Sequence, residues 1–174
     1  METSDVRITT LKDLLDHNAR RFTLAEIQLS AVLPTWIHQA TEMKLKSVLQ
    51  RYLDFALKNS ERLNSFMREE EIGDLSVSNK VMDALIEDTS MKLASCADPE
   101  VRDACLLASV QSINHFKISI YGTAAAFAKT VGKGKAGELF HELEANEKQI
   151  DDRLSQLAEF EINAKAKLPP IFQA

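Results

Sequence analysis

The side chains with the clearest chemical potential are carboxylates that fall on apolar helical stripes. At about 100° per residue in a helix, Glu26 lies at the edge of the first apolar stripe and Glu147 at the centre of the last one. Asp151 follows Glu147 by one helical turn. Carboxylates that point into a helical bundle can bind iron, manganese or zinc. Glu26, Glu147 and Asp151 are therefore candidate metal ligands, for a single weakly bound ion at most.

Two further polar residues lie on the stripe of another helix. Asn114 is central to that stripe, and Lys117 lies at its border. Lys117 and Glu147 are about 16 and 14 residues from the turn between their helices, so at ~1.5 Å per residue they reach a similar depth. We expect one polar patch in the middle of the bundle, made of Glu26, Asn114, Lys117, Glu147 and Asp151.

The charge of Lys117 leaves two interpretations of this patch open. In the first, the carboxylates retain a reduced metal site. In the second, Lys117 neutralises a carboxylate and forms an ion-pair network without metal, because an unpaired buried carboxylate costs several kcal/mol. The inward-facing Tyr52 and Asn59 lie on the stripe of the second helix.

Other motifs that could carry chemistry are weak. The Glu-x-x-His from Glu138 to His141 lies away from the apolar stripe, which predicts a solvated surface. The glycine-rich stretch 132–137 follows no strand, so it indicates a helix end and a turn rather than a phosphate loop. Cys96 and Cys105 form neither a disulfide framework nor a metal motif, and we expect reduced thiols. No nucleophile–base pair or cofactor loop is recognisable, which favours a protein that is not an enzyme.

Composition restricts the fold class that must position these residues. The 174-residue chain contains 5 Gly and 4 Pro, too few for the turns of an all-β protein, so we predict an all-α fold. The net charge of −5 gives no support for nucleic-acid binding. No secretory signal or membrane-spanning stretch is recognisable, so no membrane association and a cytoplasmic location are expected.

Apolar periodicity predicts long helices in two hairpins, separated by a connection that holds a shorter helix. Pro34 lies inside the first stripe, where it predicts a kink rather than an end. Asp98 and Pro99 predict the start of the fourth helix. This topology favours a ferritin-like four-helix bundle with an additional short helix in the crossover. The predicted domain is 1–164, with a tail over 165–174. The stripes begin and end near residues 11–37, 45–66, 81–96, 99–128 and 136–158.

Several stretches resemble the YciE/YciF bacterial ferritin-like proteins, a stress-associated family of unknown function. The most specific of them contains Tyr121, Gly122 and Thr123. The resemblance runs from about Leu11 to Ala164 and implies a ferritin-like bundle, a homodimer and a di-metal site of inward carboxylates. The stretches that carry it are 25–29, 102–104, 115–123 and 147–151.

The chain departs from the family pattern at the metal positions. Where the family commonly has Glu-His-Tyr-Glu, this chain has Asn114, His115, Phe116 and Lys117, so both acids are lost. Two metal ions need roughly four to six ligands. The leading hypothesis is therefore a non-catalytic dimer with a degenerate di-metal site, a stress-related role and an unidentified protein partner. The alternative is a metal-binding oxidase-type or storage protein with a reduced carboxylate site.

Overall fold

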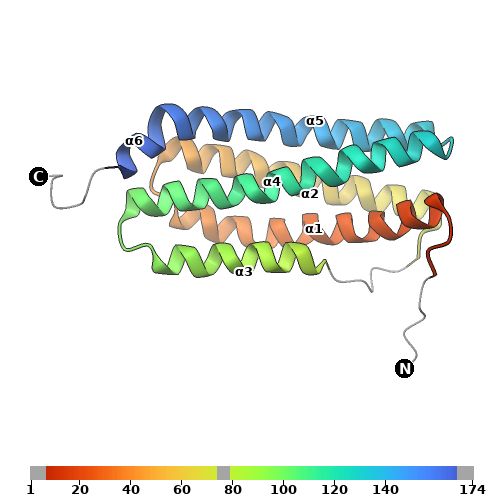
Figure 1. Ribbon diagram of the computed structural model, residues 1–174, viewed down its shortest axis with the longest axis horizontal. Helices are drawn as coiled ribbons and strands as arrows, with labels where there is room; N and C mark the ends of the chain where they lie inside the picture. Colours follow the sequence, from red (N-terminus) through yellow and green to blue (C-terminus); the bar gives the residue numbers. More distant parts are fainter. Residues whose placement is uncertain (1–6, 74–78, 168–174) are drawn as a thin grey trace, which may run out of the picture.

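The computed structural model describes residues 7–73 and 79–167, and all regular structure in these residues is helical. The all-α prediction is therefore confirmed. Figure 1 shows the helices side by side along one long axis. They are α1 (Leu11–Gln39), α2 (Met43–Glu69), α3 (Lys80–Ser95), α4 (Pro99–Thr130), α5 (Gly134–Leu157), the π-helix η1 (Ala158–Ile162) and α6 (Asn163–Ala166).

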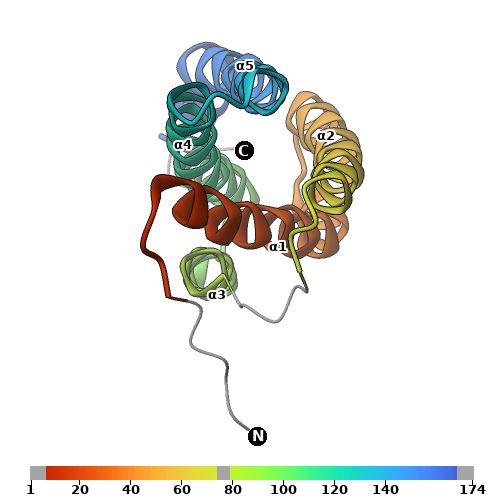
Figure 2. The same cartoon turned by 90° about the vertical axis from the view of Figure 1, so that its right-hand side faces the viewer.

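The long helices pair as two hairpins, α1 with α2 and α4 with α5. Seen end-on in Figure 2, the long helices surround a common interior, and α3 lies outside them. α2 also packs on α5 and α1 on α4, which closes the ring, whereas α3 covers α1 and α4. The connection that holds α3 therefore links the two hairpins, as the sequence pattern predicts.

Capping side chains determine where two of the long helices begin. Thr10 accepts a hydrogen bond from the Asp13 backbone, and the Asp13 side chain accepts one from the Thr10 backbone, which completes a capping box. Asp98 accepts hydrogen bonds from the first-turn backbone of α4, with Pro99 at the first helical position. The predicted start at Asp98 is confirmed, because such capping signals act within one turn of the chain.

Two helices extend further than the apolar stripes suggest. α1 continues through Pro34 to Gln39 without ending. The last helix passes from α5 through the π-turn η1 into α6 and ends at Ala166, two residues beyond the predicted domain boundary. Residues 168–174 of the predicted tail lie outside the described residues.

Helix α3 contributes to the core rather than standing apart from it. An apolar segment such as Val81 to Ile86, beside the four long helices, could pack on them or remain exposed for a dimer interface. In the structure Met82 is completely buried. Leu85 and Ile86 pack against the same apolar cluster, so much of this surface is already used within the chain.

The interior contains two apolar clusters with polar residues between them. One cluster contains Trp36 and Leu106 and the other Phe22 and Phe140. In the second, the Phe22 and Phe140 rings meet edge to face, with centroids 6.2 Å apart. Along α2, α4 and α5 the clusters are separated by buried polar residues. These residues are Asn59, Asn114, Lys117 and Glu147.

Candidate functional site

A lysine between two carboxylates forms the centre of the polar layer. The Lys117 Nζ of α4 lies 2.9 Å from Glu26 Oε2 of α1 and 2.6 Å from Glu147 Oε1 of α5. All three side chains have no exposed surface. The long helices thus contribute to one group of interacting side chains, here called the central cluster. It consists of Glu26, Tyr52, Asn59, Asn114, Lys117, Tyr121 and Glu147.

Donors from two helices hold the second oxygen of Glu26. The Tyr121 hydroxyl of α4 donates a hydrogen bond to Glu26 Oε1. The Asn59 Nδ2 of α2 donates to the same oxygen at 3.2 Å. Because Lys117 pairs with Oε2, both oxygens of this buried carboxylate have partners from within the chain. Such partners offset the large desolvation penalty of a buried charge.

Glu147 is held in the same way by a different pair of donors. The Tyr52 hydroxyl of α2 and the Asn114 Nδ2 of α4 each donate to Glu147 Oε2 at 2.8 Å. Asn114 Nδ2 also lies 2.9 Å from the Glu147 backbone oxygen, which fixes α4 against α5. The Lys117 Nζ lies 4.6 Å from the centroid of the Tyr52 ring, so the ring face adds a cation–π interaction.

Burial and the carboxylates together control protonation in the central cluster. Burial, followed by the nearby Glu147 and Glu26 charges, raises the pKa of the Tyr52 and Tyr121 hydroxyls well above their ordinary value. For Lys117, burial alone lowers the pKa, but the Glu147 and Glu26 carboxylates together outweigh it and the pKa is raised. Both tyrosines and the lysine therefore keep their protons at neutral pH.

The pKa of Glu147 reflects its burial together with a second carboxylate and one lysine. Burial raises the pKa of Glu147, the Lys117 charge lowers it, and the Glu26 charge raises it, with a net upward shift. Burial is the largest of these effects, and two ionised carboxylates beside one ammonium add one excess negative charge. The central cluster consequently depends on the ammonium, its only formally positive side chain.

The chemistry of the central cluster does not fit a divalent metal ion. Metal binding needs free carboxylate lone pairs and a site without other cations. Here the ammonium of Lys117 lies between the carboxylates, and their other oxygens accept hydrogen bonds. Within residues 7–73 and 79–167, no group of three or more His, Cys, Asp or Glu side chains could hold a metal.

Asp151, the third predicted ligand, does not join the central cluster. Its Oδ1 lies 2.9 Å from His115 Nε2 and accepts a hydrogen bond from Gln111 Nε2 at 3.3 Å. The Asp151 side chain is 24% exposed and that of His115 is 64% exposed. The structure therefore brings Glu26, Glu147, Asn114 and Lys117 together, as the stripe positions predict, and leaves Asp151 at the surface.

The tyrosine hydroxyls were not foreseen as part of the site. The sequence predicts only that Tyr52 faces inward, and Tyr121 enters there only as part of the family resemblance. A signal was present, because a tyrosine at the centre of a buried stripe needs a hydrogen-bond partner for its hydroxyl. The predicted surface position of the Glu-x-x-His motif is confirmed, since the His141 side chain is 76% exposed.

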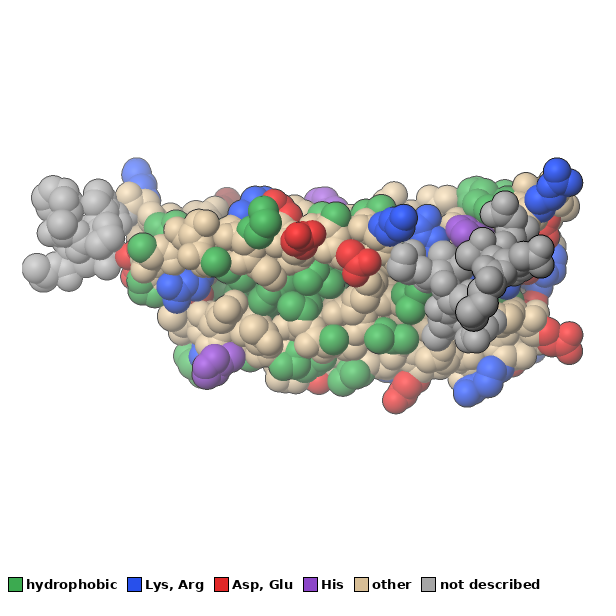
Figure 3. Space-filling view, turned by 90° about the horizontal axis from the view of Figure 1, so that it is seen from below, with side chains coloured by type: hydrophobic (Ala, Val, Ile, Leu, Met, Phe, Trp, Pro, Cys, Tyr) green, Lys and Arg blue, Asp and Glu red, His purple; other side chains and the backbone are tan. Residues whose placement is uncertain are grey.

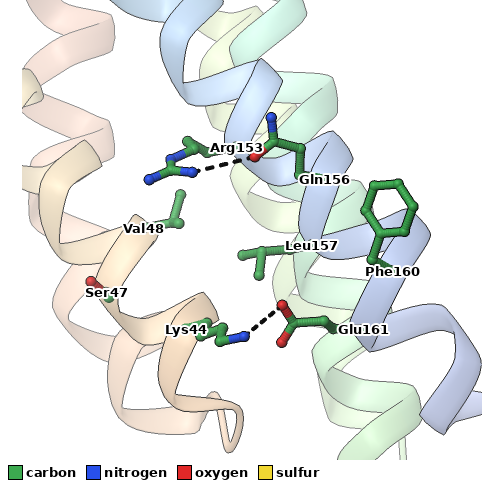
Figure 4. A pocket seen from close by; sticks show the side chains of 8 residues that line it. All are labelled: Lys44, Ser47, Val48, Arg153, Gln156, Leu157, Phe160 and Glu161. Atoms are coloured by element: carbon green, nitrogen blue, oxygen red, sulfur yellow. Dashed lines mark hydrogen bonds and ion pairs between the residues drawn. The ribbon is translucent and has the colours of Figure 1, made fainter.

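A surface groove near one end of the helical bundle is a second place where a ligand could bind. It has a volume of about 550 Å³ and lies between α2 and the end of α5 with η1 (Figure 4). Lys44 on one wall is paired with Glu161 on the other at 2.7 Å, so its charge is already compensated. No catalytic arrangement is present among its lining residues, Lys44, Ser47, Val48, Arg153, Gln156, Leu157, Phe160 and Glu161.

Comparison with known families assigns the chain. The family described as "Domain of unknown function (DUF892)" matches residues 10–167, which include every residue of the central cluster. The chain belongs to this family. The resemblance predicted from the sequence stretches is thereby confirmed.

Relatives of this DUF892 member come from two bacteria. Protein YciF of Escherichia coli strain K12 is 30% identical over 165 residues, covering 93% of this chain and 98% of YciF. The crystal structure of the E. coli stress protein YciF matches with a TM-score of 0.83 at 29% identity, covering 92% of this chain and all of that one. YcfI from Rhodopseudomonas palustris matches with a TM-score of 0.82 at 29% identity, covering 89% of this chain and 98% of YcfI.

Among the described residues, none of the helices combines the length and the apolar character needed to cross a membrane.

Proposed function

We propose that this DUF892 protein is a non-catalytic, ferritin-like four-helix bundle in which Lys117 supplies the charge that metal ions supply in metal-loaded bundles. The observation that carries the proposal is the fully buried Lys117 ammonium, paired with both Glu26 and Glu147. A divalent ion at this point would lie beside a fixed positive charge in a low-dielectric interior, where like charges repel strongly. The degenerate site then serves to hold the helices together.

The relatives support a structural role in stress. YciF of E. coli is described as a stress protein, and YcfI of R. palustris as a candidate structural protein. A bundle that is stabilised by its own side chains does not depend on metal supply, which suits a structural protein in cells whose metal content changes. This chain is accordingly proposed to act through its surface, with a protein partner.

Metal analysis of purified protein tests the proposal directly. After chelation and incubation with Fe²⁺, Mn²⁺ or Zn²⁺, the native chain should retain well under one equivalent, and its melting temperature should not rise. Lys117→Glu should gain metal binding and a metal-dependent rise in melting temperature, because the introduced carboxylate joins Glu26 and Glu147. Lys148→Glu makes the same charge change at a side chain that is 58% exposed and should gain neither.

The metal-binding alternative predicts the opposite pattern. One or more equivalents of tightly held metal on the native chain, lost in Glu147→Gln, would overturn the proposed function and favour an oxidase-type or storage protein. Glu147→Gln is the informative variant because it removes one carboxylate charge from the central cluster and keeps the side-chain shape.

A homodimer is the assembly that we include in this proposal. On α3, the Val81 and Met91 side chains are 43% and 61% exposed, and Ile27 of α1 is 41% exposed. Figure 3 shows hydrophobic side chains over the middle of the face that α3 and its neighbours form. Sedimentation at micromolar concentration should give about twice the chain mass of 19.5 kDa. A mass equal to one chain would remove the dimer from the proposal.

A further inference from the structure

The two cysteines of the chain meet where α3 passes into α4. Cys96 is the residue that ends α3, and Cys105 lies in the second turn of α4. The connection between α3 and α4 is short, and the two helices pack against each other. The first turns of α4 therefore lie beside the last turns of α3 (Figure 1). The Cys96 side chain interacts with the Cys105 thiol and contributes to the raised pKa of that thiol. Thiols nine positions apart in the sequence are therefore neighbours in space.

The position of the pair makes it reachable by small molecules. Both side chains are partly exposed. Cys96 also lines a surface cavity of about 310 Å³ between α1 and α3. Its Sγ donates a 3.3 Å hydrogen bond to the Lys92 backbone oxygen, which rotation of the side chain would release. Buried structural cysteines are inert, whereas partly exposed ones react with oxidants.

We infer that Cys96 and Cys105 form a reversible intramolecular disulfide when the protein meets a hydroperoxide. In the first step, the Cys96 thiolate attacks the peroxide O–O bond. A sulfur–oxygen bond forms, the O–O bond breaks, and the leaving oxygen takes a proton, giving a sulfenic acid and water or an alcohol. In the second step, the Cys105 sulfur attacks the Cys96 sulfur. The sulfur–sulfur bond forms, the sulfur–oxygen bond breaks, and the hydroxide takes the Cys105 proton as water.

The surroundings of the two thiols determine which of them reacts first. Cys96 reacts first because it lines the cavity. Burial and the contact with Cys96 raise the pKa of the Cys105 thiol, while Ser109 and the Lys92 charge oppose that rise. Cys105 is thereby held protonated beside Cys96 and acts second. A dithiol reductant returns both sulfurs to thiols by exchange.

The bond would fasten α3 to the bundle. It closes a loop of ten residues from Cys96 to Cys105. α3 lies outside the ring of long helices and packs against α1 and α4, so it is less enclosed than they are. Oxidation should therefore slow backbone hydrogen exchange in the last turns of α3 and leave the exchange of α2 and α5 unchanged.

Peptide mapping of the full-length chain tests this inference. The reduced protein is treated with hydrogen peroxide, remaining thiols are alkylated, and the denatured chain is cleaved with trypsin without reductant. Cleavage after Lys92, Arg102 and Lys117 places Cys96 in peptide 93–102 and Cys105 in peptide 103–117. The expected result is one joined species containing both peptides, which dithiothreitol separates, and a loss of two free thiols per chain.

Matched variants keep the test sharp. Cys96→Ser and Cys105→Ser should each fold like the native chain, and Cys96→Ser should consume peroxide through its remaining thiol more slowly than Cys105→Ser does. Neither should show slower exchange in α3 after oxidation. Two alkylated peptides after peroxide treatment, joined peptides formed only between chains, or exchange in α3 that ignores oxidation would each overturn the inference.

Discussion

Two acid–base pairs join α4 to α5 only one turn apart, yet they lie in opposite environments. Lys117 and Glu147 are separated by 2.6 Å and have no exposed surface. His115 and Asp151 are separated by 2.9 Å and are 64% and 24% exposed. The distances differ little, so contact geometry alone does not distinguish a structural ion pair from a surface one.

Burial therefore determines how much each pair contributes to the free energy of unfolding. At the surface, water and salt replace a lost partner, and exposed ion pairs contribute about 0–1 kcal/mol. In the interior nothing replaces it, and removal of one partner leaves a charge without compensation at a cost of about 3–5 kcal/mol. The same two helices thus carry one pair that the fold depends on and one that it can lose.

Alkaline pH should have the largest effect, because it removes protons on which the buried central cluster depends. The pKa values of Tyr52, Tyr121 and Lys117 are raised in the folded chain above their ordinary values of 10.0 and 10.5. Above these values the unfolded chain has released protons that the folded chain keeps, so the free energy of unfolding falls as pH rises. With three protons involved, the slope should be roughly 4 kcal/mol per pH unit, and this stability is fully present below pH 10.

Tyrosinate absorbance measures this transition because the chain has two tyrosines, both in the central cluster. The absorbance should stay low above pH 10 and rise only together with the unfolding reported by Trp36 fluorescence. A smooth titration near pH 10 in the folded protein would show that the hydroxyls are accessible and that the buried pair is not sealed from water.

Lys117→Met should cause the next largest effect. The substitution keeps much of the side-chain length but leaves Glu26 and Glu147 without a cation, which should lower the free energy of unfolding by about 3 kcal/mol. Urea denaturation followed by circular dichroism measures the change. Lys148→Met, at an exposed position of α5, is the matched control and should change stability little. Equal effects of the two variants would mean that burial of Lys117 does not matter.

Glu147→Gln should destabilise the chain less than Lys117→Met. The amide removes the excess negative charge of the central cluster and leaves the Lys117–Glu26 pair, but it places an N–H donor or a neutral oxygen against the ammonium. We expect a loss of about 1–2 kcal/mol in the same urea experiment, the size of one impaired hydrogen bond to a charged group. A loss larger than that of Lys117→Met would contradict the dependence on the ammonium.

His115→Ala and Asp151→Asn should have the smallest effects and thereby sharpen the comparison. Each should change the free energy of unfolding by no more than about 0.5 kcal/mol, because the pair is exposed and screened. In a double-mutant cycle the His115–Asp151 coupling should be several times smaller than the Lys117–Glu147 coupling. Coupling energies of equal size would show that both pairs are structural.

The sequence by itself determined the helices and the direction of most side chains. Apolar spacing and the cap at Asp98 act within one or two turns, so they predicted the start of α4 correctly. The helical repeat also placed Glu147 at the centre of a stripe and Glu26 and Lys117 at stripe edges, and counting residues from the turn placed Lys117 and Glu147 at one depth. These quantities depend on local geometry, which one chain segment specifies without its neighbours.

Only the tertiary structure decided which side chains at the stripe edges enter the core. Lys117 and Asp151 lie at comparable stripe edges in the sequence, yet the first is completely buried and the second lies near the surface. A small rotation of a helix about its axis exchanges such positions, and the packing of all neighbouring helices sets that rotation. The partners of the tyrosine hydroxyls and the contribution of α3 to the core depend on the same packing between segments far apart in the chain, which no local pattern encodes.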